Sequence, residues 1–180
     1  FIVDFIQSIF FKIIGVNWHA YIFHSSVFNT IASIFTYYFI SSLRVSKFYS
    51  FIYTLCFATL AYTISGTPFV DHHASIFLLI GTYLLAFVIR STDKNYLWPF
   101  VIILYSLSFL SKQVPVSYAI LTQGSLVFFI LLKDRSLKAL AIIFLSSISV
   151  LSLFIFFLFT LGIEYKLFYT QYLEYPSSIG

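Results

Sequence analysis

The stretch Ser65 to Ser75, SGTPFVDHHAS, lies between two apolar runs that are each long enough to cross a bilayer. It contains one acid and two adjacent histidines, on a background made mostly of Phe, Ile, Leu, Tyr and Ser. Ionisable groups are costly to keep near hydrocarbon, so by default they mark a functional site. Asp71 and its neighbours are therefore the centre of the predicted site.

The composition predicts an integral membrane protein. Hydrophobic residues make up 61% of the 180 residues, and charged residues only 9%. So few charges cannot cover the surface of a water-soluble domain of this length. The basic residues form no patch that suits a nucleic acid. The single cysteine, Cys56, is expected to be a buried small apolar residue. Because the sequence has no Met and opens mid-pattern, we expect an internal fragment of a larger protein.

The apolar runs predict an all-α fold, a polytopic transmembrane helix bundle with about six spans, forming a single domain over 1–180. Residues 1–15 place Asp4, Ser8 and Lys12 four apart. On a helix this spacing gives one polar stripe, which is typical of an amphipathic helix lying in the membrane interface. The end of a truncated span is the alternative interpretation.

The expected spans lie within 20–162. The apolar run from Tyr96 to Leu132 is too long for one crossing of about 20 residues, and Ser111–Pro115 interrupt it, so we expect two helices there. A Tyr-rich external tail is expected at 163–180. The predicted spans are Ala20–Leu43, Phe48–Ser65, Ala74–Ile89, Tyr96–Leu110, a fifth ending at Leu132, and Ala139–Gly162.

Charge is distributed unevenly between alternate loops. Of the ten basic residues, Lys12, Lys112 and Lys166 fall on one predicted side. The other seven fall on the opposite side: Arg44, Lys47, Arg90, Lys94, Lys133, Arg135 and Lys138. By the positive-inside rule the larger set is cytoplasmic, so Asp71 and Lys112 are expected to face the same external or lumenal compartment.

Asp71, His72 and His73 allow three interpretations. An acid at a helix start accepts backbone hydrogen bonds and suits the helix dipole, which is a purely structural role. A divalent metal site is a second possibility, because carboxylate and imidazole both bind such ions. Adjacent histidines on a helix point about 100 degrees apart, so only one of them would share a ligand set with Asp71. The third interpretation is an acid that deprotonates an acceptor, with histidines that contact an anionic donor.

Lys112 lies on the side that is otherwise poor in lysine, between two apolar helices. A lysine that reaches the lipid headgroups is the structural interpretation. A cation that holds a lipid phosphate is the functional one. The first span also carries a polar stripe, which is typical of helix–helix contact more than of a substrate path. The stripe consists of His24, Ser25, Asn29, Ser33 and Thr36.

The order of these features resembles the polytopic, lipid-sugar-dependent glycosyltransferases of the C superfamily, which include the protein O-mannosyltransferases and aminoarabinose transferases. Residues 19–44, HAYIFHSSVFNTIASIFTYYFISSLR, look like the family's helix after the first large external loop. GTPFVDHHASIFLLIGTYLLAF, residues 66–87, is similar to the second-loop motif, in which an acid after a proline precedes an apolar helix. LYSLSFLSKQVPVSYAIL, residues 104–121, resembles the short span that ends in a small residue, Lys and a turn. The end of the chain, FYTQYLEYPSSIG, is similar to the external loop that follows.

This resemblance implies transfer of a sugar, with inversion, from a polyprenyl-phosphate carrier to a glycan, lipid or protein acceptor. Asp71 takes the place of the second-loop acid, although it follows Pro68 by three residues. Lys112, with its neighbour Gln113, takes the place of the lysine near the lipid phosphate, and His72 and His73 would help to bind substrate. The family's principal catalytic acid would lie upstream of Phe1.

The resemblance implies a multi-pass protein of a membrane, the bacterial inner membrane in preference to the endoplasmic reticulum. The resemblance implies no particular cofactor, and the sequence leaves a divalent metal as an open alternative. The alternative function is a multi-pass transporter or flippase subunit for lipid-linked or other hydrophobic substrates. Helices broken by Gly or Pro near the midplane would favour transport. In this sequence Gly66, Pro68 and Pro115 fall at predicted helix ends, which favours the enzyme.

Overall fold

The computed structural model describes residues 2–62, 66–90 and 92–174, and within these ranges every regular element is helical. The all-α prediction is confirmed. The elements are α1 (Ile2–Ile14), α2 (Trp18–Ser42), α3 (Lys47–Leu60), α4 (Val70–Arg90), η1 (Thr92–Leu97), α5 (Trp98–Ser111), α6 (Val116–Lys133), α7 (Leu137–Thr160), α8 (Tyr165–Tyr169) and η2 (Thr170–Glu174).

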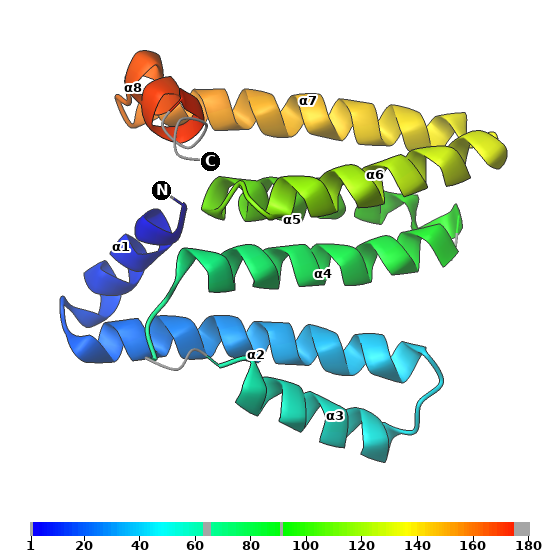
Figure 1. The fold of residues 1–180 in the computed structure, drawn as a ribbon, viewed down its shortest axis with the longest axis horizontal. Helices are drawn as coiled ribbons and strands as arrows, with labels where there is room; N and C mark the ends of the chain where they lie inside the picture. The colour runs from blue at the N-terminus through cyan, green and yellow to red at the C-terminus, as the bar shows by residue number, and fades with distance from the viewer. Residues whose placement is uncertain (1, 63–65, 91, 175–180) are drawn as a thin grey trace.

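Helices α2 to α7 run alternately in opposite directions along one long axis (Figure 1). The loops after α2, α4 and α6 lie at one end of this bundle, and the loops after α3, α5 and α7 lie at the other. The seven basic residues counted above belong to the first set of loops and the helix ends beside them. The two predicted sides of the membrane therefore correspond to the two ends of the bundle.

Local signals set several of the helix ends. The side chain of Asn17 accepts a hydrogen bond from the backbone N–H of Ala20 (3.0 Å) and caps the start of α2. Pro115 occupies the cap position of α6, and Lys112 caps α5 in an extended conformation. The break between α5 and α6 thus falls at Ser111–Pro115, and the prediction that the long apolar run divides there is confirmed.

Only three helices in the described part of the chain are long and apolar enough to cross a membrane: α4, α6 and α7. Six were predicted. Helices α3 and α5 have 14 residues each. At 1.5 Å per residue they reach about 21 Å, short of a hydrocarbon core of about 30 Å. The predicted span Phe48–Ser65 was too long, since α3 ends at Leu60; residues 63–65 lie outside the described residues.

Helix α2, with 25 residues, is long enough to cross a membrane. It is not apolar enough, because the face that it turns toward the bundle is polar. His24, Ser25, Asn29 and Thr36 are all buried in the bundle. The polar stripe predicted for the first span therefore lies at contacts with other helices, as its helix–helix interpretation expected.

The apolar core forms around α4 and α5. It includes Leu85 and Val88 of α4, Trp98 and Val101 of α5, and residues of α6 and α7. Gly81 lets the two central helices approach closely, because a Cβ atom at this position would lie 2.5 Å from the Tyr105 ring. This close packing fixes α4 and α5, the helices that carry Asp71 and Lys112, against each other.

The outer helices α3 and α7 leave most of their apolar side chains exposed. Ser50 is the one buried residue of α3, and only Ala139 and Leu158 are buried in α7. Cys56 is exposed on α3, so the prediction of a buried cysteine was wrong. The error arose because apolarity in a membrane protein does not distinguish a core position from a lipid-facing one.

Candidate functional site

Asp71 and Lys112 meet at the end of the bundle opposite the basic loops. Asp71 lies in the first turn of α4, Lys112 caps the end of α5, and the Lys112 Nζ atom pairs with Asp71 Oδ1. The two residues are 41 positions apart in the sequence. Their side chains stay open to solvent, with 62% of Asp71 and 41% of Lys112 exposed. The two charges expected to share one side therefore lie at the same end of the bundle, where they form an ion pair that the sequence did not predict.

A buried hydrogen bond holds the two helix ends together below this ion pair. Ser108 Oγ, in the last turn of α5, donates to the backbone carbonyl of Ala74 in the second turn of α4 at 2.6 Å. Ser108 is fully buried. An exposed ion pair contributes little to stability. The packing of α4 against α5 therefore brings the two charges together, and the ion pair does not hold the helices in place.

The C-terminal segment is fastened to the loop that carries Lys112. The Gln113 side chain donates from Nε2 to the backbone carbonyl of Tyr172 at 2.6 Å. The Tyr172 hydroxyl donates to the backbone carbonyl of Leu110 at 2.7 Å. Burial, together with the negative charge of Asp4, raises the pKa of Tyr172 to about 12. This hydroxyl therefore keeps its proton, and its donor role, at neutral pH. Gln113 has a structural partner in this arrangement and does not join the ion pair.

The two adjacent histidines point to different helices, as their angular separation predicted. His72 donates from Nε2 to the backbone carbonyl of Ala61, the cap of α3, at 3.1 Å. His73 points inward and is fully buried. Neither histidine is hydrogen-bonded to Asp71 or Lys112 in the described residues.

His73 belongs to a buried polar chain that joins three helices. Its Nδ1 atom donates to the Phe69 carbonyl at 3.0 Å, and its Nε2 atom lies 2.9 Å from Nε2 of His24 on α2. The Nδ1 atom of His24 lies 2.7 Å from the amide oxygen of Gln7 on α1. Phe10 stacks on His24, and Phe28 covers His73 with a centroid distance of 4.4 Å. The chain Gln7–His24–His73 is thus enclosed by aromatic rings.

No three His, Cys, Asp or Glu side chains in residues 2–62, 66–90 and 92–174 lie close enough together to hold a metal ion. A ligand set that joins Asp71 to either histidine is not formed, because the two rings turn away toward α2 and α3. The metal interpretation of this stretch therefore gains no support from the geometry.

An apolar cavity of about 480 Å³ lies between α5, α6, α7 and the C-terminal segment. Leu110 of α5 borders it two residues before Lys112, and Tyr172 of the C-terminal segment borders it as well. The cavity is lined by Ile102, Tyr105, Ser106, Phe109, Leu110, Ile120, Ser147, Val150, Leu151, Phe154, Phe168 and Tyr172. At this end of the bundle, therefore, the exposed cation of Lys112 follows Leu110, a residue of the cavity wall, by two positions in the sequence.

Sequence reasoning missed Gln7 and Tyr172. Gln7 falls outside the stripe of Asp4, Ser8 and Lys12, and a buried glutamine among apolar residues was the available signal. Tyr172 is one of 14 tyrosines, so composition does not single it out. No protein-family model, curated protein or solved structure matches this chain.

Proposed function

We propose that this chain is the membrane part of a glycosyltransferase that moves a sugar from a polyprenyl-phosphate carrier to an acceptor on the external or lumenal side. The observation that carries the proposal is the open ion pair between Asp71 and Lys112. In this proposal α2 to α7 make six passes of a bacterial inner membrane, with the basic loops in the cytoplasm. The short helices α3 and α5 are accommodated by local thinning of the bilayer.

The charges suit the two ends of a group transfer. Asp71 accepts the proton of the acceptor hydroxyl as its oxygen forms a bond to the anomeric carbon of the sugar. The bond between that carbon and the carrier phosphate breaks, and the phosphate leaves with the bonding electrons. Lys112 has three N–H donors, so it can bind the departing phosphate while it keeps its contact with Asp71.

The apolar cavity beside Lys112 suits the carrier lipid. A polyprenyl phosphate needs a cation for its phosphate and apolar surface for its chain, and about 480 Å³ of apolar space begins two residues from Lys112. Pockets of a few hundred Å³ are typical of sites that enclose small ligands. The resemblance to the C superfamily points to the same class of donor.

The test is sugar transfer from a lipid-linked donor by the full-length protein. Asp71→Asn and Lys112→Ala are each expected to lower turnover by about a hundredfold or more, because an oriented base or a phosphate-binding cation is lost. Lys112→Ala should also need more donor to reach half-maximal rate, and Lys112→Arg should restore activity only in part, because Arg presents a different donor geometry to phosphate.

Lys12→Ala is the matched control, since Lys12 is an exposed lysine on the same predicted side. It should transfer sugar at the wild-type rate. Wild-type turnover in a well-inserted Asp71→Asn variant would leave Asp71 with the structural role of an acid in the first turn of α4.

A transporter is the second candidate, and the buried Gln7–His24–His73 chain is the observation that favours it. Intramembrane histidines often form proton relays in pumps and transporters. Movement of a lipid-linked substrate across liposomes, with no transfer of sugar, would favour this function over the enzyme.

A further inference from the structure

A smaller apolar cavity, of about 240 Å³, adjoins the cavity that lies beside Lys112. The two cavities share three wall residues, Ile102 and Tyr105 of α5 and Ile120 of α6. The smaller cavity lies on the far side of these residues from Lys112, because Trp98, the first residue of α5, lines it. We call it the deep cavity.

The two cavities together follow one face of each helix that they separate. On α5 their lining residues recur every three or four positions from Trp98 to Leu110. The same spacing holds on α7, where the lining residues are Leu140, Ile143, Ser147, Val150, Leu151 and Phe154. Residues three or four positions apart share one face of a helix. The cavities therefore form one groove between α5 and α7, with α6 as its third wall, and we call it the α5–α7 groove.

The groove runs along the axis of the bundle. Helices α5 and α7 run in the same direction, from the basic loops toward the end that carries Lys112 (Figure 1). Leu110 marks the end of the groove beside Lys112, and Trp98 marks its deep end. At 1.5 Å per residue these two wall residues are about 18 Å apart along α5, which is more than half of a hydrocarbon core of about 30 Å.

The wall of the deep cavity suits a hydrocarbon chain. None of its lining residues is charged. The Tyr105 hydroxyl donates to Gln123 Oε1, and Trp98 Nε1 donates to Asn95 at 3.3 Å, so both donors already have partners in the protein. The Tyr105 ring also packs closely against Gly81, which keeps the ring from turning into the cavity. An apolar cavity of this kind is a poor site for water and a good one for hydrocarbon.

The connection to Lys112 selects one kind of chain. Under the proposed function Lys112 binds the carrier phosphate, and the chain that follows enters the first cavity at Leu110. A cavity of that size encloses a drug-sized ligand. A polyprenyl chain is longer, so it has to continue past Tyr105 into the deep cavity or leave for the bilayer. A phospholipid fits less well, because it has two chains and the groove is a single channel.

We propose that the α5–α7 groove binds the first part of the polyprenyl chain in an extended form, with the phosphate at Lys112 and the chain passing Tyr105 to reach Trp98. This inference rests on the proposed function, because the carrier and its position at Lys112 come from there. Each isoprene unit adds apolar contact until the chain reaches Trp98, and units beyond that point add no affinity.

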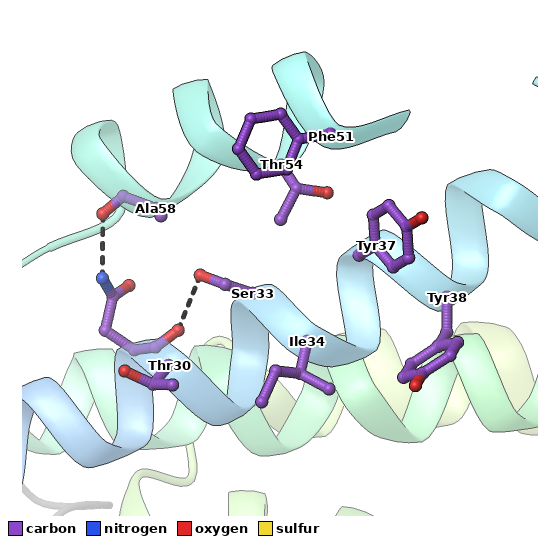
Figure 2. A pocket seen from close by; sticks show the side chains of 9 residues that line it. Thr30, Ser33, Ile34, Tyr37, Tyr38, Phe51, Thr54 and Ala58 are labelled. Atoms are coloured by element: carbon purple, nitrogen blue, oxygen red, sulfur yellow. Dashed lines mark hydrogen bonds between the residues drawn. The ribbon is translucent and has the colours of Figure 1, made fainter. Parts of the chain in front are cut away.

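A cavity between α2 and α3 provides an internal reference. It also has a volume of about 480 Å³, and Figure 2 shows Phe51 and Thr54 of α3 across it from Ser33 and Tyr37 of α2. None of its lining residues belongs to α5, α6 or α7, so it does not join the groove. A lipid that enters cavities of the bundle without regard to Lys112 would label both places.

Photo-crosslinking in liposomes with carriers of graded length tests this proposal. The full chain is exposed to geranyl, farnesyl or geranylgeranyl phosphate with a diazirine on the last isoprene unit, and labelled peptides are located by mass spectrometry. The label is expected within 106–110 and 147–154 for geranyl phosphate, and within 98–101 and 140–143 for geranylgeranyl phosphate. Farnesyl phosphate should label between them, and 29–38 and 51–58 should stay unlabelled. Unlabelled decaprenyl phosphate should compete as well as geranylgeranyl phosphate does.

Two variants, each with a matched control, connect the label to the groove. Lys112→Ala should reduce labelling by every carrier by about tenfold or more, because a hydrogen bond to a charged group is lost, while Lys12→Ala should not. Gly124→Phe should remove the geranylgeranyl label from the deep cavity and leave the geranyl label in place. Gly124 lines the deep cavity, and a Cβ atom there meets nothing within 4 Å, so the ring has room to enter it. Ser125→Phe, one position along α6 and outside both cavities, is its control.

Three results would overturn the proposal. Labels that do not move toward Trp98 as the carrier lengthens would mean that the chain leaves for the bilayer beside Tyr105, and the proposed function would stand. Equal competition by phosphatidic acid would make the groove a phospholipid site. A complete lack of labelling by all three carriers would remove the carrier site at Lys112, and with it the proposed function.

Discussion

At the level of single residues, the contact between His24 and His73 requires an account of its protons. The Phe69 carbonyl is an acceptor, so His73 carries a proton on Nδ1. If His24 Nδ1 donates to the Gln7 oxygen, the Nε2 atom of each neutral ring carries no proton. The two Nε2 lone pairs would then face each other at 2.9 Å. A turned Gln7 amide removes this conflict: its NH₂ group donates to His24 Nδ1, and His24 Nε2 donates to His73. The amide nitrogen of Gln7, which otherwise has no partner, is then satisfied.

We predict this neutral arrangement, because no carboxylate of the described residues is hydrogen-bonded to the pair and a buried unpaired charge is costly. Nitrogen-15 NMR of the labelled rings should find His24 protonated on Nε2 and His73 on Nδ1 at neutral pH. Gln7→Leu, which removes the amide donor, should change the His24 shifts and leave those of His72 as they are. Protonation of both nitrogens on either ring would show instead that the pair shares an added proton.

The candidate site was predictable at this scale only in part. The charge pattern predicts that Asp71 and Lys112 share a side, and the two residues do meet at one end of the bundle. The inward turn of His73 does not follow, since its partner His24 lies 49 residues away on another helix. Helical spacing shows that His72 and His73 diverge but not which of them is buried.

At the level of the helices, Gly81 is the position where α4 and α5 come closest. We predict that Gly81→Ala lowers the free energy of unfolding by about 1–3 kcal/mol, because the new methyl group would lie 2.5 Å from the Tyr105 ring and the core cannot expand freely. Thermal unfolding in detergent, followed by the helical circular dichroism signal, measures the change.

Gly124→Ala is the control, since a Cβ atom at this position of α6 would meet nothing within 4 Å. It should leave stability unchanged or raise it by up to about 1 kcal/mol, because alanine favours the helix more than glycine does. Equal effects of the two substitutions would mean that helix propensity, and not contact between α4 and α5, decides the outcome.

Sequence patterns located the helices better than they located the helix ends. The division at Ser111–Pro115 was readable because proline and polar residues interrupt an apolar run. The early end of α3 at Leu60 could not be predicted, because apolar residues continue beyond it. The loop is distinguished from the helix by tertiary contacts, such as the hydrogen bond between His72 and the Ala61 carbonyl.

At the level of the whole molecule, the alternation of helix direction predicts which residues share a side of the membrane. Cysteines placed one at a time at Lys94 and Lys112, in a Cys56→Ala background, should react with an impermeant thiol reagent from opposite sides. The reason is that these positions lie at opposite ends of the bundle (Figure 1). Lys47 should behave like Lys94, and Glu164 like Lys112.

If the cysteines at positions 94 and 112 react from the same side, the six helices α2 to α7 do not all cross the membrane. Within the part of the chain that the structure describes, such a result would leave α4, α6 and α7 as the candidate spans and would require α5 to return without crossing.

The fastening of Gln113 to the Tyr172 backbone has a consequence for biogenesis. A nascent chain that has released α6 from the ribosome already contains Asp71 and Lys112, but the residue that fixes the Lys112 loop is 59 positions beyond Gln113. The Gln113 bond is made to a main-chain carbonyl and the Tyr172 hydroxyl adds a second bond to Leu110, so both require that the segment has been synthesised and folded back. The loop around Lys112 therefore reaches its final form only after translation has passed α8, so incomplete products that enter the membrane would carry the charged pair without its completed surroundings.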